Sequence, residues 1–285
     1  MSNPAILLNA SPLISTDELA AILDRPHVKT IDGSWWLNGR DAYADYLQQR
    51  IGGAVFFDLE AVSDHSSPLP HMLPTAEDFA AAVSALGIAD SDHIVVYDRQ
   101  GMFSAARVWW TFAVMGASKV QVLDGGYPKW VAEGRAVETG KPEPLAPETF
   151  NAHLNHDAVI SLSEMLAELG TSTQIIDARG AARFDGTAPE PRAGVRSGHM
   201  PGAMNLPFGE LLNPDKTMKG GLELETAFQN IGLDMDRPVI TSCGSGVTAA
   251  ILTLGLTLLG KPSRLYDGSW SEWGSQQDTP IETTP

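Results

Sequence analysis

The chain has only one cysteine, Cys243, among its 285 residues, so an intrachain disulfide is excluded. A metal site built from several thiolates is excluded for the same reason, and the seven histidines are dispersed along the sequence. We therefore expect no metal site. With no disulfide to maintain, the protein fits a reduced compartment.

Basic residues and long apolar runs are also scarce. Lysine and arginine total 19 against 35 aspartates and glutamates, which disfavours nucleic acid and anionic membranes as partners. The longest strongly apolar run, residues 249–259, is too short to cross a bilayer. No basic residue precedes Arg25, so we expect neither a secretory signal nor a transit peptide. These shortages favour a cytoplasmic protein without a membrane partner.

Apolar strand-like runs alternate with helical stretches along the chain, which is typical of a parallel α/β fold. We expect the main strands at residues 28–32, 93–98, 119–124, 174–177, 239–242 and 264–267. The alternation stops between residues 136 and 157, where three prolines lie among polar residues, as in a semi-rigid linker. Because the length fits two domains, we place them at 1–137 and 158–285, with a linker at 138–157.

The two halves repeat each other segment by segment. IDGSW matches IDARG, and VVYDRQG matches VITSCGSG, with equal spacing: 66 residues lead from Asp32 to Asp98, and 66 lead from Asp177 to Cys243. An internal duplication explains both observations. Asp98 then stands at the cysteine position of the first half, where a carboxylate cannot act as a sulfur nucleophile. We expect the second half to be catalytic and the first to support it.

Cys243 lies where a predicted strand meets a predicted helix. Residues 239–242 suit a buried strand, Gly244 and Gly246 form a short loop, and residues 247–259 have helical length. A turn of this kind points backbone N–H groups inward at a helix N-terminus, which favours an anionic group at its mouth. A lone cysteine can also be merely a small buried hydrophobic residue. The glycine loop favours a nucleophile.

Three motifs carry a resemblance to a known family: CGSGVT at Cys243, GHMPGA at Gly198 and DGSWSEWG at Asp267. With the tandem halves, they resemble the two-domain rhodanese superfamily and, within it, the 3-mercaptopyruvate sulfurtransferases. The resemblance implies two tandem rhodanese-like domains, each a parallel sheet flanked by helices. It also implies a persulfide on Cys243 and no cofactor. The sulfur would pass to a thiol, a thioredoxin-type reductant or cyanide.

The resemblance also implies which residues contact the substrate. Arg183 and Arg192 match the two arginines that would hold the mercaptopyruvate carboxylate, and arginine suits this role because its fork binds carboxylates in pairs of bonds. Arg196 lies nearby and is an alternative to either. The anionic sulfur and the substrate would contact the loop residues Gly244, Gly246, Val247 and Thr248.

A serine, a histidine and an acid complete the implied site. Ser245 matches the family's serine and His71 its histidine. The family has an aspartate in FFDID where this chain reads FFDLE, so the matching acid is Glu60, and Asp58 is a second candidate. We interpret His199, in GHMPGA, as structural.

Other functions are weaker fits. A cysteine phosphatase needs Cys-x5-Arg, but the sixth residue after Cys243 is Ala249. Thiosulfate sulfurtransferases carry a basic pair where this chain has Gly244 and Ser245, although thiosulfate remains an alternative donor. A non-enzymatic sulfur-relay module is the third alternative, which the Asp98 half alone would suggest.

Overall fold

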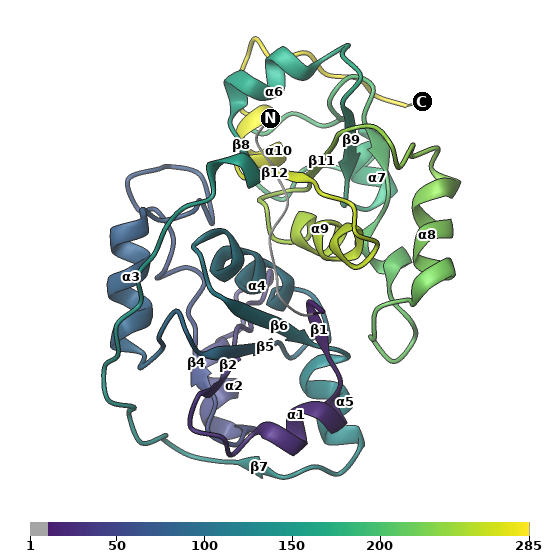
Figure 1. Cartoon of the computed structure of the whole chain (residues 1–285). Helices are drawn as coiled ribbons and strands as arrows, with labels where there is room; N and C mark the ends of the chain where they lie inside the picture. Colours follow the sequence, from purple (N-terminus) through teal and green to yellow (C-terminus); the bar gives the residue numbers. More distant parts are fainter. Residues whose placement is uncertain (1–10, 285) are drawn as a thin grey trace.

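The computed structural model describes residues 11–284, which form two units, each built on a five-stranded sheet (Figure 1). The strands of the first sheet are β1 (Leu13–Ile14), β2 (Val28–Asp32), β4 (Val55–Phe56), β5 (His93–Tyr97) and β6 (Lys119–Leu123). The helices of this unit are α1 (Thr16–Ile22), α2 (Ala42–Gln48), α3 (Ala76–Ala85), α4 (Ala105–Val114) and α5 (Gly126–Ala132). The sheet is parallel, in the order β1-β6-β5-β2-β4.

The second unit has the same plan. Its strands are β8 (Val159–Ile160), β9 (Gln174–Asp177), β10 (Met204–Asn205), β11 (Val239–Ser242) and β12 (Arg264–Tyr266). Its helices are α6 (Leu162–Glu168), α7 (Ala181–Phe184), α8 (Gly221–Asn230), α9 (Ala249–Leu258) and α10 (Ser269–Trp273), with short 3-10 helices η1 (His156–Ala158) and η2 (Phe208–Leu211). The sheet is parallel, in the order β10-β9-β11-β12-β8. Taken from the β8 edge, this order matches that of the first sheet strand for strand, with β8 in the place of β1 and β11 in the place of β5. The predicted tandem α/β fold is confirmed.

The duplication extends to the helix starts. Ser15 caps α1 in a capping box with Glu18, and Ser161 caps α6 in the same way with Glu164. In each box the serine oxygen accepts a free backbone N–H, and the glutamate returns to the N–H of the serine. Each half therefore begins its first helix by the same local chemistry.

The two units meet through α4 and α9, which lie against each other at the junction (Figure 1). Both helices are apolar around most of their circumference, and one continuous buried cluster includes side chains from each. A helix buried on nearly all sides belongs in the middle of a molecule. Since each follows the loop of interest in its own half, this packing fixes the two loops relative to each other.

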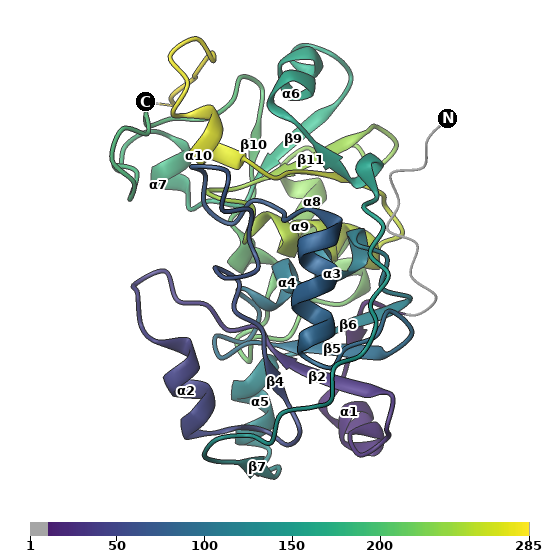
Figure 2. The same cartoon turned by 90° about the vertical axis from the view of Figure 1, so that its left-hand side faces the viewer.

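The segment between the units is tied to the first one. Strand β7 (Val137–Glu138) pairs antiparallel with β3 (Arg50–Ile51), and further along the backbone N–H of Glu148 donates to the carbonyl of Ser84. The chain then rises past α3 into the second unit (Figure 2). The domain boundaries at residues 137 and 158 stay a prediction.

The structure has elements that the sequence pattern did not predict. Helix α7 lies in the segment after β9, and α5 and α10 each follow an Asp-Gly turn. Helices α7, α5 and α10 have four, seven and five residues, too short for an apolar period to stand out. Within residues 11–284, none of the helices has the length and apolar character needed to cross a membrane.

Candidate active site

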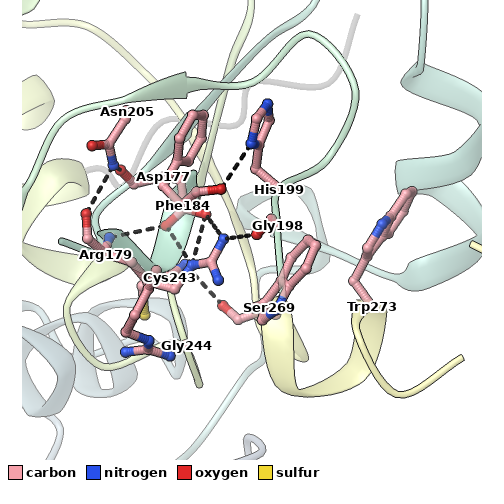
Figure 3. Close-up of polar contacts among 12 residues, drawn as sticks. Asp177, Arg179, Phe184, Gly198, His199, Asn205, Cys243, Gly244, Ser269 and Trp273 are labelled. Carbon is pink, nitrogen blue, oxygen red and sulfur yellow. Dashed lines mark hydrogen bonds and ion pairs between the residues drawn. The ribbon is translucent and has the colours of Figure 1, made fainter. Parts of the chain in front are cut away.

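Cys243 directly follows β11, with 1% of its surface exposed, and begins the loop that leads into α9. Gly246 has a left-handed backbone, φ 76°, and an added Cβ there would lie 2.7 Å from the Arg107 guanidinium, so glycine is required. Ser269 stabilises the loop, because its Oγ accepts the N–H of Cys243 at 3.3 Å (Figure 3). The same oxygen accepts the N–H of Gly246 at 3.0 Å. Ser269 belongs to the DGSWSEWG motif, but no role was predicted for it.

The loop has backbone donors to offer an anion. Among the described residues, no acceptor is found for the N–H groups of Gly244, Ser245, Val247 and Thr248, whereas that of Gly246 is taken by Ser269. Unpaired N–H groups at a strand-to-helix turn can bind negative charge.

The first half shows how such a nest is filled. Asp98 follows β5 as Cys243 follows β11, and its carboxylate is fully buried. Its Oδ2 accepts the backbone N–H groups of Phe103, Ser104 and Ala105 at 2.6, 2.8 and 2.8 Å. Oδ1 accepts the N–H of Gln100 at 2.8 Å. The equivalent loop of the first half therefore encloses an anionic side chain of its own.

Three predicted residues come together beside Cys243, although two of them belong to the other half. Ser245 Oγ lies 3.0 Å from Nδ1 of His71, and Nε2 of His71 lies 3.0 Å from Oε1 of Glu60. Asp58 instead accepts the backbone N–H groups of Glu60 and Ala61, so Glu60 is the acid in contact with the histidine. The chain thus forms a Ser–His–Glu line across the junction of its halves.

Burial and charge act on this line in opposite directions. Burial lowers the pKa of His71 below its ordinary value, and the nearby Glu60 carboxylate partly offsets this by raising it. Burial raises the pKa of Glu60, but its interactions with His71, the hydrogen bond from Trp35 and the charge of Arg192 together outweigh this effect, so the pKa lies below the ordinary value. The balance favours a neutral imidazole beside an ionised carboxylate.

A buried ion pair connects helix α4 of the first half to the turn after β12 in the second half. Arg107, on α4, contacts Oδ1 of Asp267 at 2.6 Å, and both side chains are almost fully buried. Arg107 also donates to the carbonyl of His71 at 2.5 Å, and Oδ2 of Asp267 accepts the N–H of Leu73 at 2.8 Å. His71 itself has a left-handed backbone, φ 59°, which is unfavourable for a residue with a Cβ and is held by these contacts.

The two predicted substrate arginines border the cysteine loop. Arg183, on α7, lies over Gly244, where an added Cβ would be 3.0 Å from its Nη2. Arg192 is half-buried and lies 3.4 Å from Ser271 Oγ. Burial and the charge of Arg183 lower the pKa of Arg192, while Glu60 and Cys243 oppose the shift, which places these groups in one electrostatic neighbourhood.

Other residues around the site position the arginines and do not contact the substrate themselves. The side chain of Glu190 is 4% exposed and pairs with Arg183 at 2.5 Å and with Arg179 at 2.8 Å. Arg179 in turn pairs with Asp177 at 2.6 Å (Figure 3). Arg196 donates to backbone carbonyls, including that of Thr279 at 3.0 Å, so it secures the C-terminal segment. The sequence did not predict the pairing role of Glu190.

His199 lies apart from the reacting groups. Its Nδ1 donates to the carbonyl of Phe184 at 2.8 Å, and its ring stacks on that of Phe184 with centroids 3.8 Å apart (Figure 3). This packing agrees with the structural interpretation. Over residues 11–284, no group of three or more His, Cys, Asp or Glu side chains is arranged to hold a metal ion.

The arrangement can perform proton-coupled sulfur chemistry. A nucleophilic sulfur lies at a nest of backbone donors, a hydroxyl–imidazole–carboxylate line can move a proton beside it, and two guanidinium groups can bind a carboxylate.

Comparisons with known proteins point the same way. The rhodanese-like domain model matches residues 15–133 and 161–276. The 3-mercaptopyruvate sulfurtransferase of Escherichia coli K12 is 45% identical over 94% of this chain and 97% of its own length. The mitochondrial thiosulfate/3-mercaptopyruvate sulfurtransferase 1 of Arabidopsis thaliana is 44% identical over 96% of this chain and 79% of its own length. The crystal structure of SseA from Escherichia coli, titled as a 3-mercaptopyruvate sulfotransferase with the rhodanese fold, matches with a TM-score of 0.84, at 42% identity over 92% of this chain and 100% of that one.

Proposed function

The chain belongs to the rhodanese-like domain family, and on that basis we propose that Cys243 carries sulfur as a persulfide from 3-mercaptopyruvate to a thiol acceptor. The overall activity is 3-mercaptopyruvate sulfurtransferase, the activity named for relatives that are up to 45% identical over most of the chain. The residue roles that follow are inferred from the geometry.

The observation that carries the proposal is the buried carboxylate of Asp98. The oxygens of an aspartate and the terminal sulfur of a cysteine persulfide both stand two bonds beyond Cβ. By position in the repeat, the donors that bind Asp98 correspond to the N–H groups of Ser245, Thr248, Ala249 and Ala250. We infer that these four groups bind the persulfide anion as their counterparts bind the carboxylate.

The transfer step is balanced without an outside oxidant. The Cys243 thiolate attacks the thiol sulfur of 3-mercaptopyruvate, an S–S bond forms, and the C–S bond breaks to release pyruvate as its enolate. The proton of the substrate thiol is transferred to the enolate carbon, so Cys243 is left as a persulfide anion. Ser245 and His71 carry this proton, and Glu60 orients the imidazole.

The arginines bind the other end of the substrate. In a protein with a formal net charge of -16, an anionic substrate needs a local positive site. Arg183 and Arg192 provide it beside the cysteine loop, and Glu190 fixes the direction of the Arg183 fork. We assign both arginines to the carboxylate of 3-mercaptopyruvate.

The second half-reaction needs an acceptor from outside the chain. A thiolate, of a small thiol or a thioredoxin-type protein, or cyanide attacks the outer sulfur of the persulfide and releases the Cys243 thiolate. Such acceptors are kept reduced in the cytoplasm, where we place the enzyme, although one relative is named as mitochondrial.

Thiosulfate is a second candidate donor, because the Arabidopsis relative is named for both donors. The loop itself has no cationic side chain, since Gly244 and Ser245 follow the cysteine. We therefore expect thiosulfate to be the poorer donor.

Intact mass spectrometry tests the proposal. Incubation with 3-mercaptopyruvate should add the mass of one sulfur atom, and dithiothreitol should remove it. Cys243→Ser should gain nothing under the same conditions. An unchanged mass of the wild-type protein while pyruvate accumulates would contradict a persulfide intermediate. Measuring the rate of sulfur transfer from thiosulfate under the same conditions shows which of the two donors is used faster.

A further inference from the structure

Glu60 has a poor environment for an orienting acid. Its side chain is 57% exposed, and a long flexible carboxylate in solvent has many conformations to choose from. A residue that orients His71 must keep one of them. Its Oε1 is nonetheless held from two sides, at 3.0 Å by Nε2 of His71 and at 2.8 Å by the indole Nε1 of Trp35.

We propose that Trp35 is a positioning residue of the sulfur-transfer site, which holds Glu60 in line with His71. The indole N–H donates to the same oxygen that contacts the imidazole, and the Trp35 ring meets the His71 ring edge-on, with centroids 4.7 Å apart. One rigid side chain therefore restrains both the acid and the histidine. This inference rests on the function proposed above for the Ser245–His71–Glu60 line.

The first half holds Trp35 with the loop around Asp98. The N–H of Trp35 donates to Ser104 Oγ at 3.1 Å, and its carbonyl accepts from the Gln100 side chain at 3.0 Å. The ring of Phe103 lies parallel to the indole, with centroids 6.2 Å apart. All three of these neighbours donate their backbone N–H groups to Asp98. The non-catalytic loop thus has a use: it supports the residue that supports the acid.

The adjacent tryptophan is a natural control. Trp36 has a similar exposure, but its indole N–H donates to Asp45 Oδ2 at 3.0 Å, and Arg40 lies over its ring at 4.7 Å. None of these partners belongs to the proposed site. Replacing Trp36 by phenylalanine removes an indole hydrogen bond to a carboxylate, as the same change does at Trp35, but away from His71.

The expected signature is a change in rate together with a change in pH profile. Trp35→Phe keeps an aromatic ring but removes a hydrogen bond to a charged group, so kcat/KM should fall roughly tenfold. The charged groups acting on His71 are Glu60, Arg107 and Arg192, and only Glu60 raises its pKa. A loosened Glu60 raises it less, so the acidic limb of the profile should move to lower pH. Loss of packing alone would lower the rate without moving this limb.

The experiment compares pyruvate release by the full chain and its variants across pH, with folding checked by circular dichroism. Trp36→Phe should stay within about twofold of wild type. Trp35→Phe placed in a Glu60→Ala background should also add less than about twofold, because its partner is already gone. Equal effects at the two tryptophans, an unmoved limb, or a full additional loss in the Glu60→Ala background would each overturn the inference.

His71→Ala separates this inference from the proposed function. A loss of roughly 100-fold or more is expected if His71 carries the proton. Wild-type activity in His71→Ala would overturn the proposed relay itself, whatever Trp35 does. If Trp35→Phe does not fold, Gln100→Ala is the second test, because it frees the Trp35 carbonyl and should move the limb in the same direction. An unchanged profile in Gln100→Ala would then count against the inference.

Discussion

His71 and Lys216 are counterparts in the two halves, and both have left-handed backbones, with φ 59° and 69°. Each lies two residues before a residue whose N–H donates to an aspartate of the opposite half. The two bonds are Leu73 to Asp267, at 2.8 Å, and Met218 to Asp124, at 2.7 Å. The two halves therefore contact each other through the same hydrogen bond twice. In each case a loop of one half lies over the Asp-Gly turn of the opposite half.

The docking is repeated, but the chemistry is not. One of these contacts places His71 against Ser245. The other places Lys216 over Gly101, beside a loop whose N–H groups already bind Asp98. A lysine ammonium has no free lone pair with which to accept a proton. Under the proposed function, one copy of the duplicated junction forms the proton-transfer line, and the other is a structural contact.

Asp98→Ala should lower the free energy of unfolding by roughly 2 to 4 kcal/mol, because buried N–H groups of its loop lose their acceptor. The variant is expected to be less stable because this fully buried carboxylate accepts four hydrogen bonds. Urea denaturation measures it. Asp64→Ala is the control, since Asp64 accepts its bonds from Ser66 in an exposed turn and should change stability little. Equal midpoints for the two variants would contradict the account.

The pair of Arg107 and Asp267 gives a second stability prediction. Arg107→Met leaves Asp267 buried without its cation, and roughly 3 to 5 kcal/mol of stability should be lost. Adding Asp267→Leu should cost much less than that single change, because no uncompensated charge remains. The control pair is Arg264 with Glu164, which is partly exposed; Arg264→Met should cost under about 1 kcal/mol. Additive losses in the double variant would show that the two charges act separately.

The duplicated strands and the cysteine loop were predictable because their signals are local. A buried parallel strand appears in the sequence as a short apolar run. Cys243, Gly244 and Gly246 lie between such a run and a helical stretch, which indicates a strand-to-helix turn. His71 and Glu60 are different. They were assigned by resemblance, since nothing in the sequence alone says that a loop of the first half reaches Ser245.

The supporting residues could not be predicted because their partners are distant in the sequence. Arg107 stands in an otherwise apolar helix, and its partner Asp267 belongs to the other half. Trp35 and Glu60 are in the same half, but their contact depends on how the loops after β2 and β4 fold back. Periodicity describes which face of an element is buried; it does not describe which buried charge meets another.

The activity should fall on the acid side as His71 takes up a proton. Because burial lowers the pKa of His71, the midpoint of this limb should lie below the ordinary value of about 6.5. Stability should follow the same sign: the unfolded chain binds the proton more readily, so the folded state loses stability as pH falls below about 6.5. A pH profile of kcat/KM and urea titrations at several pH values measure both. A limb above pH 7 would exclude His71 as its source.

Cys243→Ser should abolish sulfur transfer while the protein stays folded. A hydroxyl is not ionised at neutral pH, and oxygen cannot hold a persulfide. The change is small in volume, so thermal unfolding should stay near that of wild type. Pyruvate release from 3-mercaptopyruvate and the melting temperature are the two measurements. Substantial turnover by this variant would rule out the cysteine mechanism.

Substrate choice should depend on the arginines and on the loop residue beneath one of them. Replacing Arg183 or Arg192 by alanine should weaken transition-state binding of 3-mercaptopyruvate by roughly 2 to 4 kcal/mol, and lysine should restore only part of it, since it lacks the fork. Arg196→Ala is the control, because Arg196 donates to backbone carbonyls and should change kcat/KM little.

The complementary change makes the loop basic. Gly244→Arg with Ser245→Lys should raise thiosulfate use, because counter-charge then stands beside the sulfur, and should depress mercaptopyruvate use for two reasons. Any side chain at position 244 meets the Arg183 guanidinium, whose Nη2 would be 3.0 Å from the new Cβ, so the fork must shift from its present position. The hydroxyl that contacts His71 is also lost. The ratio of kcat/KM for the two donors measures the switch. If the ratio is unchanged, the loop does not set specificity, and the preference for 3-mercaptopyruvate must depend on Arg183 and Arg192 alone.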